Sequence, residues 1–313
     1  AGATVFKKFI ETMMCGDTEL INLLQEMFGY CLWPSTAYQR GFFLIGSGSN
    51  GKSKLMDLLT AILGGKDNVS NTAFSAINSD FGRYSLVNKL ANIAGEIDFS
   101  SPIQSDYFKM ITSGDTIEIN RKHKDQYSYT PYVKLIFLTN KMPPIKDYTY
   151  GFYRRLTLIP FNLNFDESGV KDPFIIDKLM PELQLIFIWA AQGLCRLHQQ
   201  GKFSKAKASD VLLADYRLKS NSLEVFLQEF CEVGDEKTHT CQRSDFMAAY
   251  EKMCRAYKFT AKNISNVATE LRANHAVCER RLGGRENRDF SFAGVSIAKV
   301  FVEDWTTDRW AAV

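Results

Sequence analysis

Residues 42–53 read Phe42-Phe43-Leu44-Ile45-Gly46-Ser47-Gly48-Ser49-Asn50-Gly51-Lys52-Ser53. The last eight match G-x-x-x-x-G-K-[ST], a loop whose backbone N–H groups turn onto phosphate oxygens at the start of a helix. An apolar run precedes this loop, and apolar residues follow it at helical spacing, at Leu55, Leu58, Leu59 and Ile62. We therefore expect Gly46–Ser53 to hold a nucleotide, with Lys52 at the β- and γ-phosphates and Ser53 on Mg²⁺.

The composition excludes several classes of protein. The 313 residues, 45% hydrophobic and 23% charged, suit a globular protein of roughly two domains. The longest apolar run, Leu185–Ala191, is far shorter than the ~20 residues that cross a bilayer, which excludes a transmembrane protein. Because the net charge is only +3, a nucleic-acid partner would have to be bound by local positive patches.

The cysteines and the first residues indicate where the protein acts. Seven cysteines are scattered without a C-x-x-C pair, which argues against a disulfide framework and a zinc knuckle and favours a reducing compartment. The chain begins Ala1-Gly2-Ala3, without a methionine or a leader, so we expect a piece of something longer with a partner domain before it.

Changes of hydrophobic period divide the chain into four parts. Residues 4–30 predict two helices around Gly16-Asp17, which we interpret as a helical collar for oligomerisation over 1–38. Short β-rich runs alternate with helical stretches from Phe42 to about Phe161, which predicts an α/β core over 39–165. A helical lid or linker is expected over 166–221. After the polar break 219–222, residues 222–313 show amphipathic helices and then a β segment around Phe290.

A second strand is expected to bring acid to the metal. Glu96 follows the run Leu90–Gly95 directly, and in an open α/β sheet such a carboxylate lies at the crevice where the phosphate loop opens. We expect Glu96 to contact Mg²⁺ and to orient the attacking water, and Asp98 could share this role. The alternative is an acid that merely ends a strand.

A third strand, Val133–Thr139, ends at Asn140. An amide there can hydrogen-bond both the γ-phosphate and the lytic water, so we expect Asn140 to sense the phosphate. By itself, an Asn before Lys-Met-Pro-Pro is a common turn residue. The other two motifs favour the functional interpretation.

Paired arginines begin a further apolar strand. Arg154 and Arg155 precede Leu156, and an arginine from a neighbouring subunit can stabilise the transferring phosphoryl group. We expect Arg155 to be this finger and Arg154 to support it. The alternative is a surface ion pair.

Residues 117–129 alternate on both flanks of a basic centre, which predicts a β-hairpin with a positive tip. The tip carries Arg121, Lys122, His123 and Lys124. From the residues alone, a solvated charged turn is a better interpretation than a site for nucleic acid.

In this order, the motifs resemble the superfamily 3 helicases, specifically the phage and plasmid primase-helicase group that includes the poxvirus-type enzymes. The resemblance covers roughly residues 10–300 and, beyond the loop, is carried by Lys109–Thr116, Leu135–Pro143 and Tyr153–Phe161. It implies an AAA+-type P-loop core that forms a ring, commonly a hexamer, and moves along single-stranded DNA with ATP bound between subunits. One departure is that Asn92 and Gly95 interrupt the acid strand, which leaves the division of labour between Glu96 and Asp98 open.

The resemblance also implies partners and a place of action. It puts a DNA-contacting hairpin at 121–124, with Lys109 lining the same channel. It implies forked DNA as a substrate, a fused primase or polymerase domain before residue 1, and a phage, viral or mobile-element protein in the host cytoplasm. The last part, 222–313, resembles a winged-helix module, with Arg272, Arg280 and Arg281 as candidate duplex contacts. A protein-contact or packing domain is the alternative there.

The leading hypothesis is an ATP-driven replicative DNA helicase. Two alternatives stay open. The first is an initiator platform, in which nucleotide binding orders the ring but strand separation is done elsewhere. The second is another P-loop motor, such as a packaging or clamp-loading ATPase.

Overall fold

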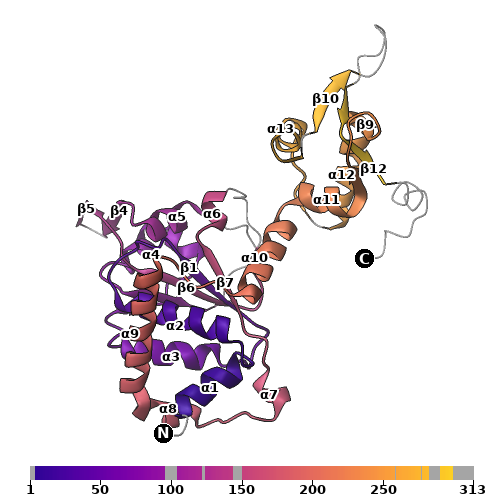
Figure 1. The fold of residues 1–313 in the computed structure, drawn as a ribbon. Coiled ribbons are helices and arrows are strands. Elements are labelled where there is room, and N and C mark those ends of the chain that lie inside the picture. The colour runs from indigo at the N-terminus through magenta and orange to yellow at the C-terminus, as the bar shows by residue number, and fades with distance from the viewer. Residues whose placement is uncertain are drawn as a thin grey trace. The chain divides into compact units, whose positions relative to one another are not determined.

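The computed structural model describes residues 4–95, 104–121, 124–143, 150–257, 259–275, 277–281 and 290–298. The chain divides into two compact units, Ala1–Tyr216 and Arg217–Val313 (Figure 1). In the described part, no helix combines the length and the hydropathy needed to cross a bilayer. The seven cysteines are all free thiols, in agreement with the sequence prediction.

A five-stranded parallel sheet organises the first unit. Its order is β2 (Val69–Ser70), β3 (Ala91–Ala94), β6 (Lys134–Thr139), β1 (Gly41–Ile45) and β7 (Leu156–Pro160). The neighbours Phe42 and Phe43 are both fully buried, and they belong to separate hydrophobic cores. Because successive side chains of a strand point to opposite faces, the sheet is covered on both sides, which explains the continuous apolar runs in its strands. The predicted α/β core is confirmed.

One core packs helices against the face of Phe42. The helices are α1 (Val5–Met13), α2 (Thr18–Leu32), α3 (Lys52–Ile62), α8 (Ile175–Leu179) and α9 (Leu183–Gln200). A Cβ on Gly29 of α2 would lie 2.4 Å from the Ala190 carbonyl oxygen, so only glycine permits this close approach of α2 to α9. The two helices predicted over 4–30 therefore belong to the core of this unit, and their role in oligomerisation stays a prediction.

The second core lies on the face of Phe43. It includes residues of η1 (Ser75–Asn78), α5 (Asp106–Ser113), α6 (Tyr150–Tyr153) and the hairpin of β4 (Ile117–Arg121) and β5 (Lys124–Tyr129), with α4 (Asp80–Tyr84) beside β4. Ile117 pairs with Tyr129 and Ile119 with Tyr127, so the predicted β-hairpin is confirmed. The remaining elements are α7 (Phe165–Ser168), η2 (Met180–Glu182) and α10 (Lys207–Ser220).

The second unit has its own core around Phe226, Tyr250 and Leu271. Its elements are α11 (Ser222–Phe230), β8 (Cys231–Val233), β9 (Thr240–Gln242), α12 (Arg243–Ala256), α13 (Ile264–His275), β10 (Cys278–Arg281), β11 (Phe290–Ala293) and β12 (Val295–Ile297). The strands form a β10-β11-β9 sheet and a β12-β8 pair. Helices therefore precede the β segment around Phe290, as the sequence predicts. The polar break is shorter than expected, because α10 continues to Ser220 and Asn221 caps α11.

Candidate active site

The loop Gly46–Gly51 joins β1 to α3 with a backbone that requires glycine. Gly48 and Gly51 have φ of +109° and +79°, in the left-handed region. A Cβ on Gly46 would lie 2.1 Å from Asn50 Nδ2 and 2.5 Å from the Phe161 carbonyl oxygen. Gly51 is the N-cap of α3, so the first N–H groups of this helix open toward the loop. This arrangement favours an anion.

Lys52 places a positive charge inside the loop. Its side chain is buried, and Nζ donates a hydrogen bond to the Gly46 carbonyl oxygen at 2.7 Å. Burial lowers the pKa of Lys52 to about 8, because desolvation penalises the charged form. Ser53 is exposed beside it. The loop therefore combines oriented N–H donors, an ammonium group and a hydroxyl that can reach a metal ion.

A cavity of about 1370 Å³ lies over the loop. One side is formed by Gly48–Lys54, Gly95 and Leu138–Asn140, which belong to or follow the carboxyl ends of β1, β3 and β6. These ends share one edge because the three strands are parallel neighbours. The structure therefore brings Asn140 and the end of the acid strand to the phosphate loop.

The remaining residues that line the cavity were not identified from the sequence. They form a second wall, which consists of residues of α1 (Val5, Lys8, Phe9 and Thr12) and of a segment that includes Phe165 and Val170–Pro173. The rings of Phe9 and Phe165 stack at 6.2 Å between centroids beside Gly51. Phe9 lies on the same buried face of α1 as Phe6, Ile10 and Met13, so its spacing in the sequence is that of a core residue and does not single it out.

Hydrogen bonds attach this second wall at both ends. The Phe165 N–H donates to the Ser49 carbonyl oxygen at 2.8 Å, which joins it to the loop. The Glu182 carboxylate of η2 accepts from the N–H groups of Val5 and Phe6 at 3.0 and 2.8 Å, which joins η2 to the start of α1. The wall is thus a built part of the cavity.

The acid strand contains a buried amide for a structural reason. Asn92 Oδ1 accepts from Ser70 Oγ at 2.8 Å and from the Thr72 N–H at 2.7 Å, and Nδ2 donates to the Thr72 carbonyl oxygen at 2.9 Å. Asn92 interrupts the apolar run of β3 because its side chain hydrogen-bonds β2 and the residues that follow β2. Gly95 lines the cavity, whereas Glu96 and Asp98 lie outside the described residues, so their roles stay predictions.

The paired arginines lie at the other edge of the sheet. Gly41 begins β1, and its N–H donates to the Arg155 carbonyl oxygen at 2.8 Å, so Arg154 and Arg155 stand at the amino ends of the strands. Arg155 Nε and Nη2 donate to Ser113 Oγ at 3.1 and 2.6 Å, and Nη1 donates to the Gly151 carbonyl oxygen. Arg154 is exposed. The structure does not bring either arginine to the cavity of its own chain.

The hairpin is attached to η1, α4 and α5 by a buried arginine. Arg83 Nη1 donates to the Asn78 carbonyl oxygen at 2.8 Å, and its guanidinium lies 3.9 Å over the Tyr107 ring and pairs with Asp80. Asp80 in turn accepts from Asn120 Nδ2 at 2.7 Å, on strand β4.

The basic tip itself is only partly described. Arg121 and Lys124 end β4 and begin β5, but their side chains, and Lys122 and His123 altogether, lie outside the described residues. Lys109 lies on α5 with Nζ at 3.4 Å from Asp106 Oδ1. In the described part, no group of three or more His, Cys, Asp or Glu residues is placed to hold a metal ion. A Mg²⁺ ion at the loop would therefore depend on Ser53, on phosphate oxygens and on the acid segment after Gly95.

Comparison with known proteins confirms the resemblance to the phage and viral primase-helicase group. Residues 44–155 match the family of unknown function DUF5906. A protein of Acanthamoeba polyphaga mimivirus, provisionally named a helicase, is 30% identical over 155 residues, which are 48% of this chain and 16% of that protein. The chain thus corresponds to a small part of this relative.

Solved structures share the fold. The C-terminal region of NrS-1, in an apo form, matches with a TM-score of 0.59 and 15% identity over 94% of this chain and 76% of that one. A second apo structure of the same region matches with a TM-score of 0.56 over 93% of this chain and 75% of that one.

Proposed function

We propose that this chain is the motor region of a DNA helicase of superfamily 3 type, in which an AAA+-type P-loop core uses ATP to move along single-stranded DNA. The proposal rests on one observation. Lys52, Ser53, Asn140 and Gly95, the last at the end of the acid strand, line the same cavity. The viral relative and the fold of the NrS-1 region support the same assignment.

The cavity fits a nucleoside triphosphate. The N–H groups of the loop and the Lys52 ammonium hold the phosphates, and Ser53 with Glu96 holds Mg²⁺. A bound Mg²⁺ ion would neutralise charge on the phosphate oxygens. The nucleoside packs against α1, where Phe9 and Val5 supply an apolar surface and Thr12 a hydroxyl.

Hydrolysis needs groups beyond the loop. Asn140 and Gly95 both line the cavity, and Glu96 follows Gly95 in the sequence. We assign the Asn140 amide to the γ-phosphate. We assign the orientation of the attacking water to Glu96, with Asp98 and Asn140 in support.

The arginine pair acts on the site of a neighbouring subunit in this proposal. The amino and carboxyl edges of a parallel sheet face opposite ways, so an arginine of one subunit can meet the phosphate loop of the next in a closed ring. Because Arg155 is bonded to Ser113 and Arg154 is exposed, we assign the trans contact to Arg154 and its support to Arg155. From the sequence alone, we expected the opposite assignment, with Arg155 making the trans contact and Arg154 supporting it.

The hairpin tip contacts the DNA strand. Arg121, Lys122, His123 and Lys124 provide charge for phosphates, and Lys109 lies on the helix before the hairpin. The second unit, with helices followed by strands, acts as a winged-helix-like module. A hexameric ring around single-stranded DNA at a fork is the assembly that these assignments favour.

Loss of the Lys52 ammonium is the direct test. Lys52→Ala should abolish both ATP hydrolysis and unwinding of a forked duplex with a single-stranded tail, because the triphosphate loses its charge partner. Lys66→Ala removes an exposed lysine elsewhere and should leave both rates unchanged. If Lys52→Ala still unwound the duplex, the proposal of an ATP-driven motor would be contradicted. If the unmodified chain hydrolysed ATP without unwinding the duplex, the initiator platform would be favoured.

A further inference from the structure

The segment that follows β7 runs beside the phosphate loop. The Phe161 N–H donates to the Ile45 carbonyl oxygen at 2.7 Å, where the loop begins. Further along, the Phe165 ring lies 3.1 Å from the position that a Cβ on Gly51 would take, where the loop ends. We call residues 161–166 the clamp segment, because they contact both ends of the loop.

Ser49, in the middle of the loop, has a backbone conformation that side chains disfavour. Its φ is +45°, and within Gly46–Gly51, all of which the structure describes, no other residue than glycine shares a positive φ with it. Left-handed residues in a turn bring successive N–H groups to one side, where they form a concave site for an anion. The loop therefore needs Ser49 in a conformation that costs free energy for a residue with a Cβ.

The clamp segment holds Ser49 by its backbone and by its side chain. The Phe165 N–H donates to the Ser49 carbonyl oxygen at 2.8 Å, and the Ser49 hydroxyl donates to the Asp166 carboxylate. Asp166 is fixed in turn, because its N–H donates to Asn164 Oδ1 at 3.0 Å at the start of α7. Surrounding contacts of this kind are what keeps a residue in a disfavoured φ.

The position of Asp166 is costly unless it has a role, because a carboxylate beside a triphosphate repels it. Lys171 Nζ compensates the charge at 2.5 Å from Asp166 Oδ1. The hydrogen bonds from Lys171 and from Ser49 hold the pKa of the Asp166 carboxyl below its ordinary value, so the carboxylate remains an acceptor at neutral pH. The side chains of Lys171 and Asp166 are 59% and 51% exposed, so their ion pair by itself adds little stability. This leaves the bond to Ser49 as the specific contact of Asp166.

From these contacts we infer that Asp166 is a positioning residue for the phosphate loop, whose carboxylate holds Ser49 in the left-handed conformation that the phosphate site requires. Asp166 is not among the described residues that line the cavity, so it acts through Ser49. The inference rests on the proposed function in one respect, which is that the ligand of the loop is a nucleoside triphosphate.

Equilibrium titration of the full chain with a fluorescent ATP analogue and Mg²⁺ provides the test. Asp166→Ala should weaken binding about fivefold, because a smaller fraction of the loops is competent to bind. Asp166→Asn loses the charge but keeps an acceptor for the Ser49 hydroxyl, so its affinity should stay within about twofold of that of the unmodified chain. Asp67→Ala removes an exposed carboxylate elsewhere and should also stay within about twofold.

The Ser49→Gly substitution separates positioning from a general loss of structure. Glycine adopts a positive φ without a supporting bond, so in this background Asp166→Ala should change the affinity less than about twofold. Ser49→Ala keeps the disfavoured φ but lacks the hydroxyl, so it should lose about fivefold, and adding Asp166→Ala should cause no further loss. Thermal unfolding checks the fold of each variant. If Asp166→Ala does not fold, the comparison of Ser49→Ala with Ser49→Gly carries the same test.

Three results would overturn the inference and leave the proposed function intact. These are unchanged binding by Asp166→Ala, an equal loss with and without Ser49→Gly, and tighter binding by both Asp166→Ala and Asp166→Asn, which would mean that the carboxylate only repels the nucleotide. In each case the unmodified chain binds the analogue and Lys52→Ala does not. If the unmodified chain itself bound no nucleotide, the proposed function and this inference would both be wrong.

Discussion

Lys52 is a charged residue in a place that disfavours charge. Burial lowers its pKa to about 8, whereas an exposed lysine keeps its proton to about pH 10. The ammonium stays close to the loop carbonyl of Gly46 and to the N–H groups at the start of α3. Only the protonated form can attract the phosphates, so nucleotide binding should depend on pH in a range where ordinary lysines do not titrate.

The affinity for nucleotide should fall as the pH rises through this pKa. With a pKa of about 8 in the free protein, the protonated fraction of Lys52 drops about tenfold between pH 7 and pH 9, and the affinity should weaken by the same factor. Equilibrium titration with a fluorescent ATP analogue at constant ionic strength measures this. In Lys52→Arg, whose guanidinium stays charged, the remaining binding should be flat over this range, and a parallel loss would assign the effect to another group.

At the scale of elements, α5 and α4 carry the hairpin. Tyr107 of α5 lies under the Arg83 guanidinium, and Arg83 with Asp80 fastens β4 through the Glu118 carbonyl oxygen and Asn120. At its other end, α5 presents Ser113 to Arg155. One short helix therefore supports both the proposed DNA contact and the arginine pair, which suggests that DNA and nucleotide affect each other through it.

Removing the Arg83 guanidinium should loosen the hairpin. We expect Arg83→Met to weaken the binding of single-stranded DNA about tenfold, because three hydrogen-bonding partners of the guanidinium lose their donor. The affinity for nucleotide should change less than about twofold, since Arg83 is not among the residues that line the cavity. Lys66→Met removes the same charge from an exposed site and should leave DNA binding unchanged. Equal losses in both variants would show that bulk charge, and not the position of the hairpin, is the cause.

At the scale of the whole molecule, the proposed site requires an arginine from a neighbouring chain. The phosphate loop follows the carboxyl end of β1, and Arg154 precedes the amino end of β7, which is parallel to β1. The same chain therefore carries the loop at one edge of the sheet and the arginine at the other. A heterologous contact that repeats around a ring would bring the two together.

Mixing two inactive variants tests this arrangement. Arg154→Ala should lower ATP hydrolysis on the order of 10³-fold, as expected for loss of an arginine supplied in trans. In an equal mixture with Lys52→Ala, about a quarter of randomly formed interfaces pair an intact loop with an intact Arg154, so activity should return. A mixture that stays inactive would contradict the trans assignment. The same experiment is done with Arg155→Ala in place of Arg154→Ala. If the mixture of Arg155→Ala with Lys52→Ala regains more activity than the mixture of Arg154→Ala with Lys52→Ala, the trans contact is made by Arg155.

Local patterns in the sequence determined much of this fold. The phosphate loop needs glycine at fixed offsets and a strand and helix on either side, and all of these are local properties of residues 42–62. The apolar runs of β1, β3, β6 and β7 predicted the buried sheet for the same reason. Strand β2 is only two residues long and has no period that a pattern could detect.

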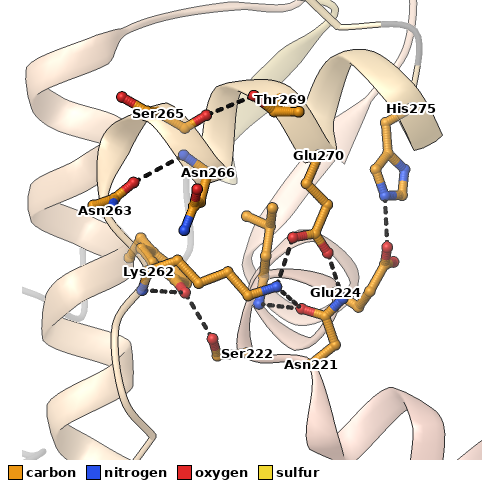
Figure 2. A network of polar contacts seen from close by, with 12 residues as sticks. Asn221, Ser222, Glu224, Lys262, Asn263, Ser265, Asn266, Thr269, Glu270 and His275 are labelled. Carbon is orange, nitrogen blue, oxygen red and sulfur yellow. Dashed lines mark hydrogen bonds and ion pairs between the residues drawn. The ribbon is translucent and has the colours of Figure 1, made fainter. Parts of the chain in front are cut away.

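Only the tertiary structure decided which residues share the cavity and which do not. The sequence does not show that α1 and the segment after Phe165 complete the cavity, because Phe9 and Phe165, which lie beside Gly51, are 42 positions before it and 114 after it. Nor does it show that Ser113 engages Arg155 and leaves Arg154 exposed, or that Lys262 pairs with Glu270 (Figure 2). Chain neighbours fix local conformation, whereas exposure and charge compensation depend on packing between distant segments.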